Sequence, residues 1–166
     1  METEIKLREP VKSDGKNIFN LIKRCKPLDV NSEYLYLLQS TYFKDTCSVA
    51  TLDNDDAIGF ISGYLAPNEK NVLFIWQVAV DERARGKSVA KRLLQEILNR
   101  DFCKDVEYIH TTISPDNESS KRFFEKFAKN LDANIETSVL FDNEDFSEGH
   151  EKEVLFKIGP FNKGKK

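Results

Sequence analysis

The segment VDERARGKSVAKRLL, residues 80–94, joins an apolar run to a stretch of helical spacing. Gly86, Lys87 and Ser88 lie at the junction, where a nucleotide-binding loop would carry the end of its Gly-x-x-x-x-Gly-Lys-Ser motif. Position 81 is Asp81 instead of the glycine that this motif requires, and the residues before Gly86 are bulky and charged. The segment therefore does not predict a triphosphate-binding loop.

The same segment still predicts a site for a phosphate-bearing ligand. The first backbone amides of a helix have no acceptors within it, and the helix dipole is positive at that end. These amides belong to Lys87, Ser88, Val89 and Ala90. Arg83, Arg85 and Lys87 add cationic donors suited to a pyrophosphate. The alternative, a basic helix start that binds nothing, stays open on this local pattern.

Apolar periodicity on either side of the junction predicts an α/β protein with one mixed sheet. The run VLFIWQVAV, residues 72–80, is almost wholly apolar, which places it in the middle of a sheet covered on both faces. Strands are expected over 5–8, 47–52, 57–65, 72–80, 106–113, 137–141 and 153–158, and helices after the caps at 13–14 and 31–32, over 88–99 and over 118–129. This order predicts seven strands flanked by about four helices.

Length and composition indicate a single globular domain over residues 1–166. Apolar residues make up 40% of the chain and charged residues 32%, an ordinary balance for a folded protein. The net charge of −3 disfavours nucleic acid as a partner. The apolar runs are too short for a membrane span or a signal peptide, so a cytoplasmic location is expected. The basic tail, 162–166, is expected to be disordered.

The cysteines and histidines show no metal-binding spacing. Cys25, Cys47 and Cys103 are odd in number, and His110 and His150 are the only histidines. A zinc site or a cysteine–histidine nucleophile has no support in this pattern, so no metal is expected. The cysteines are interpreted as small buried thiols of a reducing compartment.

The junction resembles the acetyl-CoA loop of the GNAT N-acetyltransferase superfamily. The family pattern, Gln/Arg-x-x-Gly-x-Gly/Ala, matches residues 85–90, except that Ser88 replaces the usual glycine, and its Cβ implies somewhat weaker binding of the coenzyme. The order of strands and helices is also similar across the whole chain. The resemblance implies acetyl-CoA as co-substrate, with Val78, Ala79 and Val80 along the pantetheine arm and the amide near Val78 bonded to the thioester carbonyl.

A second family-like segment is NESSKRFFEKF, residues 117–127. It resembles the pattern Asn-x-x-Ala-x-x-Leu-Tyr, which implies that Asn117 lies beside the pantetheine arm. Phe124 stands where the family often has a tyrosine that protonates the leaving thiolate. The proton must then come from another group or from water, or be dispensed with, because a thiol pKa near ~8.5 makes thiolate a tolerable leaving group.

Longer segments resemble a narrower GNAT family, whose members acetylate the 4-amino group of L-2,4-diaminobutyrate in ectoine synthesis. They are CKPLDVNSEYLYLLQSTYFKDTC (25–47), GFISGYLAPN (59–68), LFIWQVAVD (73–81), TTISPDNESSKRFF (111–124) and HEKEVLFKIGP (150–160). The resemblance covers nearly the full length. It implies direct acetyl transfer within a ternary complex and a homodimer as the usual form.

That acceptor carries two ammonium groups and one carboxylate, so its pocket should offer anionic and hydrogen-bonding groups. Asp29 is expected at an ammonium group, and Trp76 along the carbon chain, where its ring offers a cation–π face. Glu151 and Glu153 are expected to share one face of the last strand. Candidate substrate-binding residues are Asp29, Tyr34, Trp76, Glu151 and Glu153, and candidate general bases are Glu153, Tyr34 and His150. Core or solvated roles stay open for each.

Two other functions stay open on the sequence. One is a GNAT enzyme that acts on another amine, such as a polyamine or a protein terminus. The other is a non-catalytic sensor that binds acyl-CoA, to which the departures at Ser88 and Phe124 lend some weight. The aromatic segment YLYLLQSTYF, residues 34–43, suits either a dimer interface or a lid over the acceptor.

Overall fold

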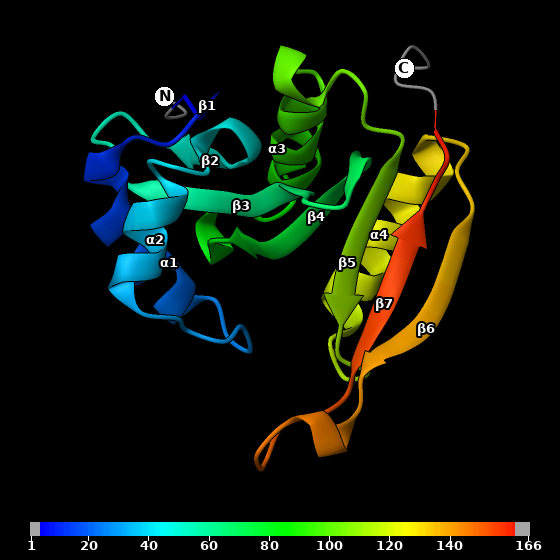
Figure 1. Ribbon diagram of the computed structural model, residues 1–166. Helices are drawn as coiled ribbons and strands as arrows, with labels where there is room; N and C mark the ends of the chain where they lie inside the picture. Colours follow the sequence, from blue (N-terminus) through cyan, green and yellow to red (C-terminus); the bar gives the residue numbers. More distant parts are fainter. Residues whose placement is uncertain (1–3, 162–166) are drawn as a thin grey trace. The chain divides into compact units, whose positions relative to one another are not determined.

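The protein is described over residues 4–161 by a computed structural model (Figure 1). The strands of this part are β1 (Lys6–Arg8), β2 (Ser48–Thr51), β3 (Ala57–Ala66), β4 (Glu69–Val80), β5 (Tyr108–Ile113), β6 (Ile135–Phe141) and β7 (Glu153–Ile158). Its α-helices are α1 (Gly15–Arg24), α2 (Glu33–Gln39), α3 (Val89–Leu98) and α4 (Glu118–Asn130). The predicted order of elements is confirmed. The tail predicted to be disordered, 162–166, lies outside the described residues.

The strands form one mixed sheet in the order β1-β2-β3-β4-β5-β7-β6. β4 is the central strand, as its apolar run predicts. β4 and β5 pair in parallel, with Phe74 opposite His110, whereas the pairs β1–β2, β2–β3, β5–β7 and β6–β7 are antiparallel. Parallel neighbours need a long crossover connection, and the segment that contains α3 supplies it.

Two compact units divide the chain, and β4 belongs partly to each. The first unit comprises Tyr64 and the residues before it, together with Trp76–Lys104. The second comprises Leu65–Ile75 and the residues from Asp105 onward. The expectation of a single domain over 1–166 stays a prediction.

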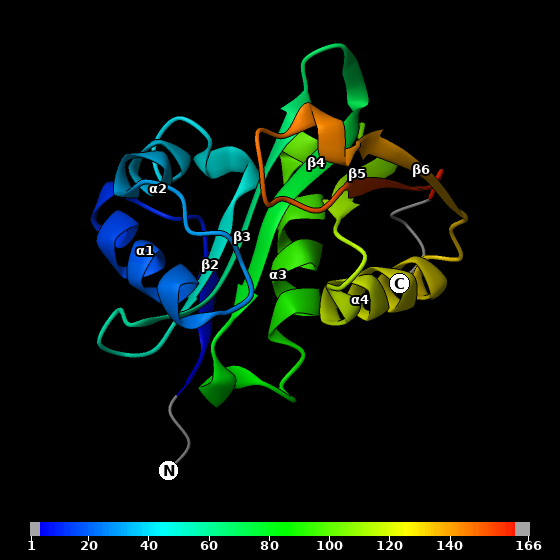
Figure 2. The same ribbon diagram turned by 90° about the horizontal axis from the view of Figure 1, so that it is seen from below.

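Helices cover both faces of β2 and β3 in the first unit (Figure 2). Gly59 faces α3, where an added Cβ would lie 2.8 Å from Val89 Cγ1, so the glycine permits a close approach of helix and strand. The next residue, Phe60, points to the opposite face and packs edge-on against Tyr36 of α2, with ring centroids 6.5 Å apart. Helices on both sides of the sheet, as predicted, follow from this alternation.

One apolar face of α1 enters the core of the first unit, as its spacing predicts. Ile18 and Leu21 are fully buried there. Asp14 occupies the N-cap position but makes no side-chain cap bond to α1. Its carboxylate instead accepts hydrogen bonds from Arg8 at 2.7 and 3.0 Å and from the amide of Val11 at 2.7 Å. The residue predicted as a cap therefore ties β1 to the start of the helix.

In the second unit, α4 packs along β5 and β7 (Figures 1 and 2). Its buried residues are Phe124, Phe127 and Ala128, which repeat at helical spacing. β6 is the edge strand, and most of its side chains are exposed. Among residues 4–161, no helix has both the length and the apolar character that a membrane crossing requires.

Candidate functional site

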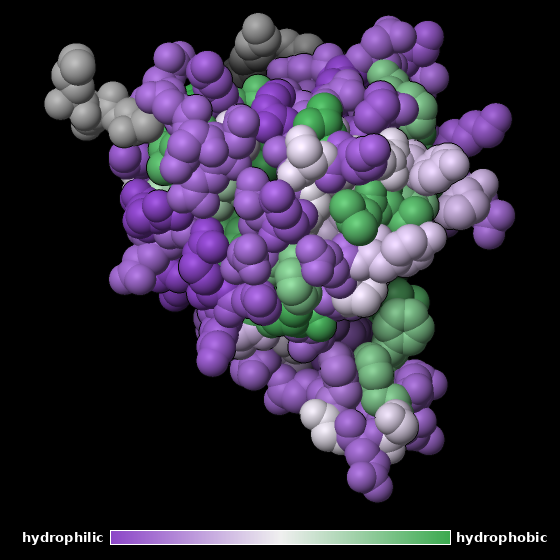
Figure 3. Space-filling view, turned by 90° about the vertical axis from the view of Figure 1, so that its left-hand side faces the viewer, coloured by the Kyte–Doolittle hydropathy of each residue, from purple (hydrophilic) through white to green (hydrophobic). Residues whose placement is uncertain are grey.

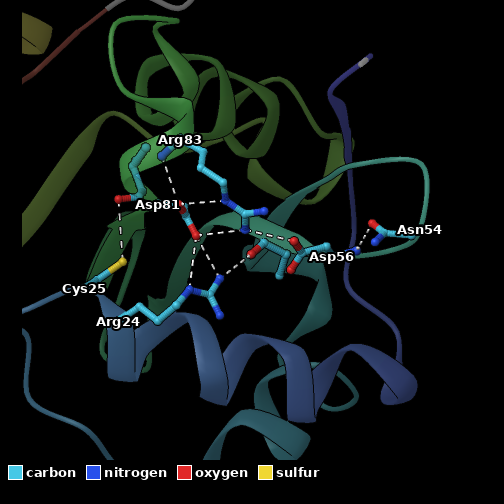
Figure 4. A network of polar contacts seen from close by, with 8 residues as sticks. Arg24, Cys25, Asn54, Asp56, Asp81 and Arg83 are labelled. Atoms are coloured by element: carbon cyan, nitrogen blue, oxygen red, sulfur yellow. Dashed lines mark hydrogen bonds and ion pairs between the residues drawn. The ribbon is translucent and has the colours of Figure 1, made fainter. Parts of the chain in front are cut away.

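The loop after β4 is held by a cluster of charges around Asp81 (Figure 4). The Asp81 side chain is 7% exposed, and its Oδ2 lies 2.9 Å from Arg24 Nη2 of α1 and 3.1 Å from Arg83 Nη2. Its Oδ1 accepts the backbone amide of Arg83 at 2.9 Å, at the start of the short helix Glu82–Ala84. Hydrogen bonds from Arg83, and then from Arg24, hold the pKa of Asp81 well below its usual value despite burial.

Arg83 is correspondingly engaged within the protein. Its Nη2 also lies 2.8 Å from Asp56 Oδ2, and hydrogen bonds to Asp81 and Asp56 raise its pKa above the ordinary value. Arg83 as a coenzyme ligand stays a prediction. Arg85 and Lys87 follow this ion-paired turn as exposed side chains.

Two residues of the loop adopt left-handed backbone conformations. Gly86 has φ +79° and Ser88 has φ +56°. Glycine reaches this region without strain, whereas a side chain makes it costly, which explains why glycine suits position 88. The backbone hydrogen bond from the amide of Arg92 to the carbonyl of Ser88, at 3.0 Å, opens the helical pattern of α3. The amides of Val89 and Ala90 precede that bond and can donate to an anion.

Replacing Ser88 with glycine is expected to stabilise the protein by about 1 kcal/mol, because the left-handed strain of the side chain is removed. The affinity for acetyl-CoA should rise several-fold, because no Cβ then crowds the ligand. Urea denaturation and titration calorimetry with acetyl-CoA measure the two effects. In α4, where the backbone is right-handed, Ser120→Gly should instead destabilise by about 0.5 kcal/mol. A Ser88→Gly protein less stable than the parent would contradict the interpretation.

The carboxyl-terminal half of β4 has one exposed face and one buried face. Trp76 is 46% exposed and Val78 on the same face is partly exposed, whereas Gln77 and Ala79 are buried on the other. An indole with this exposure is accessible to a ligand, and the role of Trp76 at the acceptor stays a prediction. The roles of Val78, Ala79 and Val80 along the pantetheine arm stay predictions.

The segment between α1 and α2, residues 25–32, is tied to β4. Gln77 Nε2 donates to the carbonyl oxygen of Asp29 at 2.7 Å, and the Tyr36 hydroxyl donates to Gln77 Oε1 at 3.1 Å. The first unit thereby brings the backbone of Asp29 to the strand residue next to Trp76. Tyr34, in the first turn of α2, is exposed. Gln77 and Tyr36 were missed in the sequence analysis. Gln77 is the polar residue within the apolar run VLFIWQVAV, and that exception could have indicated a buried hydrogen bond.

The acidic candidates of the second unit lie at and before β7. The β6–β7 ladder ends where Glu153 pairs with Phe141, so Glu153 opens the strand. Glu151 precedes the ladder, and the prediction that it shares a strand face with Glu153 is wrong. A hydrogen bond with Asp116 raises the pKa of Glu151 and lowers that of Asp116, as expected when two carboxyl groups share a proton. His150 stacks on the ring of a neighbouring phenylalanine at a centroid distance of 3.9 Å.

At the start of α4, Asn117 caps the helix. Its Oδ1 accepts the amide of Ser120 at 3.3 Å. Phe124 is 2% exposed and packs edge-on against Phe123, with ring centroids 4.9 Å apart. A phenyl ring offers no proton to a leaving group. Contact of Asn117 and Phe124 with the pantetheine arm stays a prediction.

The acetyltransferase (GNAT) family model matches residues 15–128, a range that includes the Asp81 cluster, α3 and β5. The chain therefore belongs to the GNAT acetyltransferase family. Its relatives include proteins named L-2,4-diaminobutyric acid acetyltransferase. One from Chromohalobacter salexigens is 44% identical over 155 residues, which cover 93% of this chain and 81% of the relative. One from Methylotuvimicrobium alcaliphilum is 46% identical over 158 residues, which cover 95% of this chain and 91% of the relative.

A solved structure is similar over almost the whole chain. It is the diaminobutyrate acetyltransferase EctA from Paenibacillus lautus in complex with its substrate L-2,4-diaminobutyric acid and coenzyme A. The TM-score is 0.92 at 39% identity, and the match covers 97% of this chain and 98% of that chain. Ard1 from Thermoplasma volcanium, at 20% identity and a TM-score of 0.72 over 93% of this chain and 97% of that one, shares the fold alone. The predicted GNAT-like fold is confirmed.

Proposed function

We propose that the protein transfers the acetyl group of acetyl-CoA to the 4-amino group of L-2,4-diaminobutyrate, giving N4-acetyl-L-2,4-diaminobutyrate for ectoine synthesis in the cytoplasm. The observation that carries the proposal is the similarity, at a TM-score of 0.92, to an enzyme solved with this diamine and coenzyme A. The first unit adds residues suited to the reaction: an anion-binding helix start, the exposed indole of Trp76, and Asp29 held against β4. No metal takes part in this proposal.

The reaction forms a C–N bond between the 4-amine and the acetyl carbonyl carbon, and it breaks the C–S bond of the thioester. An alkylammonium of pKa near ~10.4 is only about one part in a thousand neutral at pH 7, a cost of about 4–5 kcal/mol. Desolvation and the second ammonium group lower the pKa of the 4-amine. Glu153, Tyr34 or His150 takes the proton, directly or through water.

Negative charge develops on the thioester carbonyl oxygen and then on the sulfur of the leaving group. The amide near Val78 is the donor that stabilises the oxygen in this proposal. Phe124 has no proton to give, so the sulfur leaves as thiolate or takes its proton from water or another group. In this proposal the transfer is direct and needs no acyl-enzyme. Burial raises the pKa of Cys25 and raises that of Cys47 to about 12, which disfavours either thiolate as a nucleophile near pH 7.

A thiol-release assay with acetyl-CoA and a small amine panel tests the function, and NMR of the product gives the acetylated position. L-2,4-diaminobutyrate should turn over at least a hundred times faster than putrescine, with the acetyl group on the 4-nitrogen. Faster turnover of putrescine would favour a polyamine enzyme, and faster turnover of a peptide would favour a protein acetylase. Tight binding of acetyl-CoA without thiol release on any amine would favour a sensor.

We also propose a homodimer that uses the aromatic segment 34–43. Tyr34, Tyr42 and Phe43 are exposed by 67%, 85% and 44%, and apolar side chains are interspersed with hydrophilic ones over the face where α1 and α2 lie (Figure 3). Light scattering should give a dimer for the parent and a monomer for Tyr42→Glu. Leu140→Glu, at an apolar residue of similar exposure to Phe43 but on β6, should stay dimeric. The reverse pattern would place the interface on β6.

A further inference from the structure

Two buried polar side chains form a bridge that ends at the loop carrying Asp29. Tyr36 is fully buried and Gln77 is 7% exposed, in a largely apolar core. The Tyr36 hydroxyl donates to Gln77 Oε1, and Gln77 Nε2 donates to the carbonyl oxygen of Asp29. The amide of Asn31 donates to the Tyr36 hydroxyl at 3.3 Å. Two backbone groups of one loop are thus bound by two core side chains.

Filling the core does not require these polar groups. Phenylalanine and methionine would occupy nearly the volumes of Tyr36 and Gln77, without any hydroxyl or amide to satisfy. The strand itself is fixed separately, because the backbone amide of Gln77 donates to Ser62 Oγ at 3.1 Å. The polar ends of Tyr36 and Gln77 are therefore explained by the loop backbone that they bind.

The bridge acts on the middle of the loop. Its start is closed by the amide of Leu28, which donates to the carbonyl of Cys25 at 3.0 Å. Its end is fixed by Ser32, whose hydroxyl accepts the amide of Leu35 at 3.3 Å and caps α2. Between these two points, the hydrogen bonds from Gln77 and to Tyr36 hold the backbone on either side of Val30. The bridge thus sets the position of the residue at 29.

We propose that Tyr36 and Gln77 are positioning residues that fix Asp29 for the 2-ammonium group of the acceptor, an inference that rests on the proposed function. Gln77 lies between Trp76 and Val78 on β4. One strand segment therefore positions the Asp29 carboxylate, the Trp76 indole and the amide near Val78 that the proposed function assigns to the thioester. Tyr36 is buried, and the Gln77 side chain points away from the face of Trp76. Both therefore act through Asp29 and not on the substrate.

Tyr36→Phe and Gln77→Met test the proposal, since each keeps the side-chain volume and removes hydrogen bonds. Each should raise the KM for diaminobutyrate about tenfold and change the KM for acetyl-CoA less than twofold. The double variant should have a KM for diaminobutyrate about equal to that of the more impaired single variant, because both hydrogen bonds hold the same loop. Hydrogen exchange of the Asn31 amide should accelerate at least tenfold in each variant.

The matched control is Thr46→Val. Thr46 is 3% exposed, and its Oγ1 donates to the carbonyl of Gly63 at 2.6 Å within the same unit, so the variant also loses one buried hydrogen bond. It should leave both KM values and the exchange of Asn31 unchanged. Equal increases in both KM values, or exchange of Asn31 no faster than in the control, would overturn the proposal. A parent inactive on diaminobutyrate would refute the proposed function, and the exchange of Asn31 would still decide whether the bridge holds the loop.

Discussion

Asp29→Asn is expected to lower kcat/KM for L-2,4-diaminobutyrate about a hundredfold and to leave the affinity for acetyl-CoA within twofold of the parent. Asparagine has nearly the same size and keeps the backbone carbonyl that accepts from Gln77, so the change is confined to the side chain, which loses its negative charge and one acceptor oxygen. Loss of the anionic partner of a desolvated ammonium costs about 3 kcal/mol in the transition state. Steady-state kinetics with each substrate varied, and calorimetry with acetyl-CoA, separate the two effects.

An acceptor that lacks the 2-amine sharpens this test. Because 4-aminobutyrate has no group for Asp29 to bind, Asp29→Asn should turn it over as slowly as the parent does. A further hundredfold loss on 4-aminobutyrate would show that Asp29 does not bind the 2-ammonium group. Asp53→Asn, in the exposed turn before β3, removes one carboxylate of the same unit and should leave both reactions unchanged.

The elements of the fold could be predicted because their signals are local. α1 places Ile18, Leu21 and Ile22 on one face, and these spacings are visible in the sequence before any partner is known. The central place of β4 follows from an apolar run without alternation. The ends of elements depend on pairing between distant strands. The sequence does not show that the β6–β7 ladder stops at Glu153 opposite Phe141, so the predicted place of Glu151 on β7 is wrong.

The site depends on pairs that lie far apart along the chain, which no local period can reveal. Gln77 and Asp29 are 48 residues apart, and Arg24 and Asp81 are 57 apart. The sequence predicts an anion-binding helix start, since glycine, serine and basic residues stand there in order. It could not show that Arg83 turns back to Asp81 and Asp56, because that depends on where α1 and the turn before β3 pack.

Asp81→Ala is expected to lower the free energy of unfolding by about 2 kcal/mol and to raise the Kd for acetyl-CoA about tenfold. The carboxylate starts the turn Glu82–Ala84 through the amide of Arg83 and joins the turn to Arg24 of α1. Without the carboxylate, the guanidinium groups of Arg24 and Arg83 lose the anion between them. The loop that leads to Ser88 then loses the hydrogen bonds that hold its start. Urea denaturation and titration calorimetry measure the two losses.

The pH dependence of the Asp81→Ala effect has a defined sign. Folding lowers the pKa of Asp81, so its ionised carboxylate contributes full stability above the unfolded pKa near ~3.9, and the contribution disappears as the pH falls through the lower folded pKa. The difference in stability between parent and variant should therefore be constant between about pH 7 and pH 5 and shrink below about pH 4. A difference that grows on acidification would contradict this assignment.

Asp56→Ala separates the two partners of Arg83. It removes the ion pair between Asp56 and Arg83 but keeps the bond of Asp81 to Arg24, and its carboxylate is 32% exposed against 7% for Asp81. A pair this accessible to water contributes less than about 1 kcal/mol, so Asp56→Ala should bind acetyl-CoA almost as well as the parent. A loss as large as that of Asp81→Ala would mean that the position of Arg83, and not the bridge from Asp81 to α1, determines how the loop meets the coenzyme.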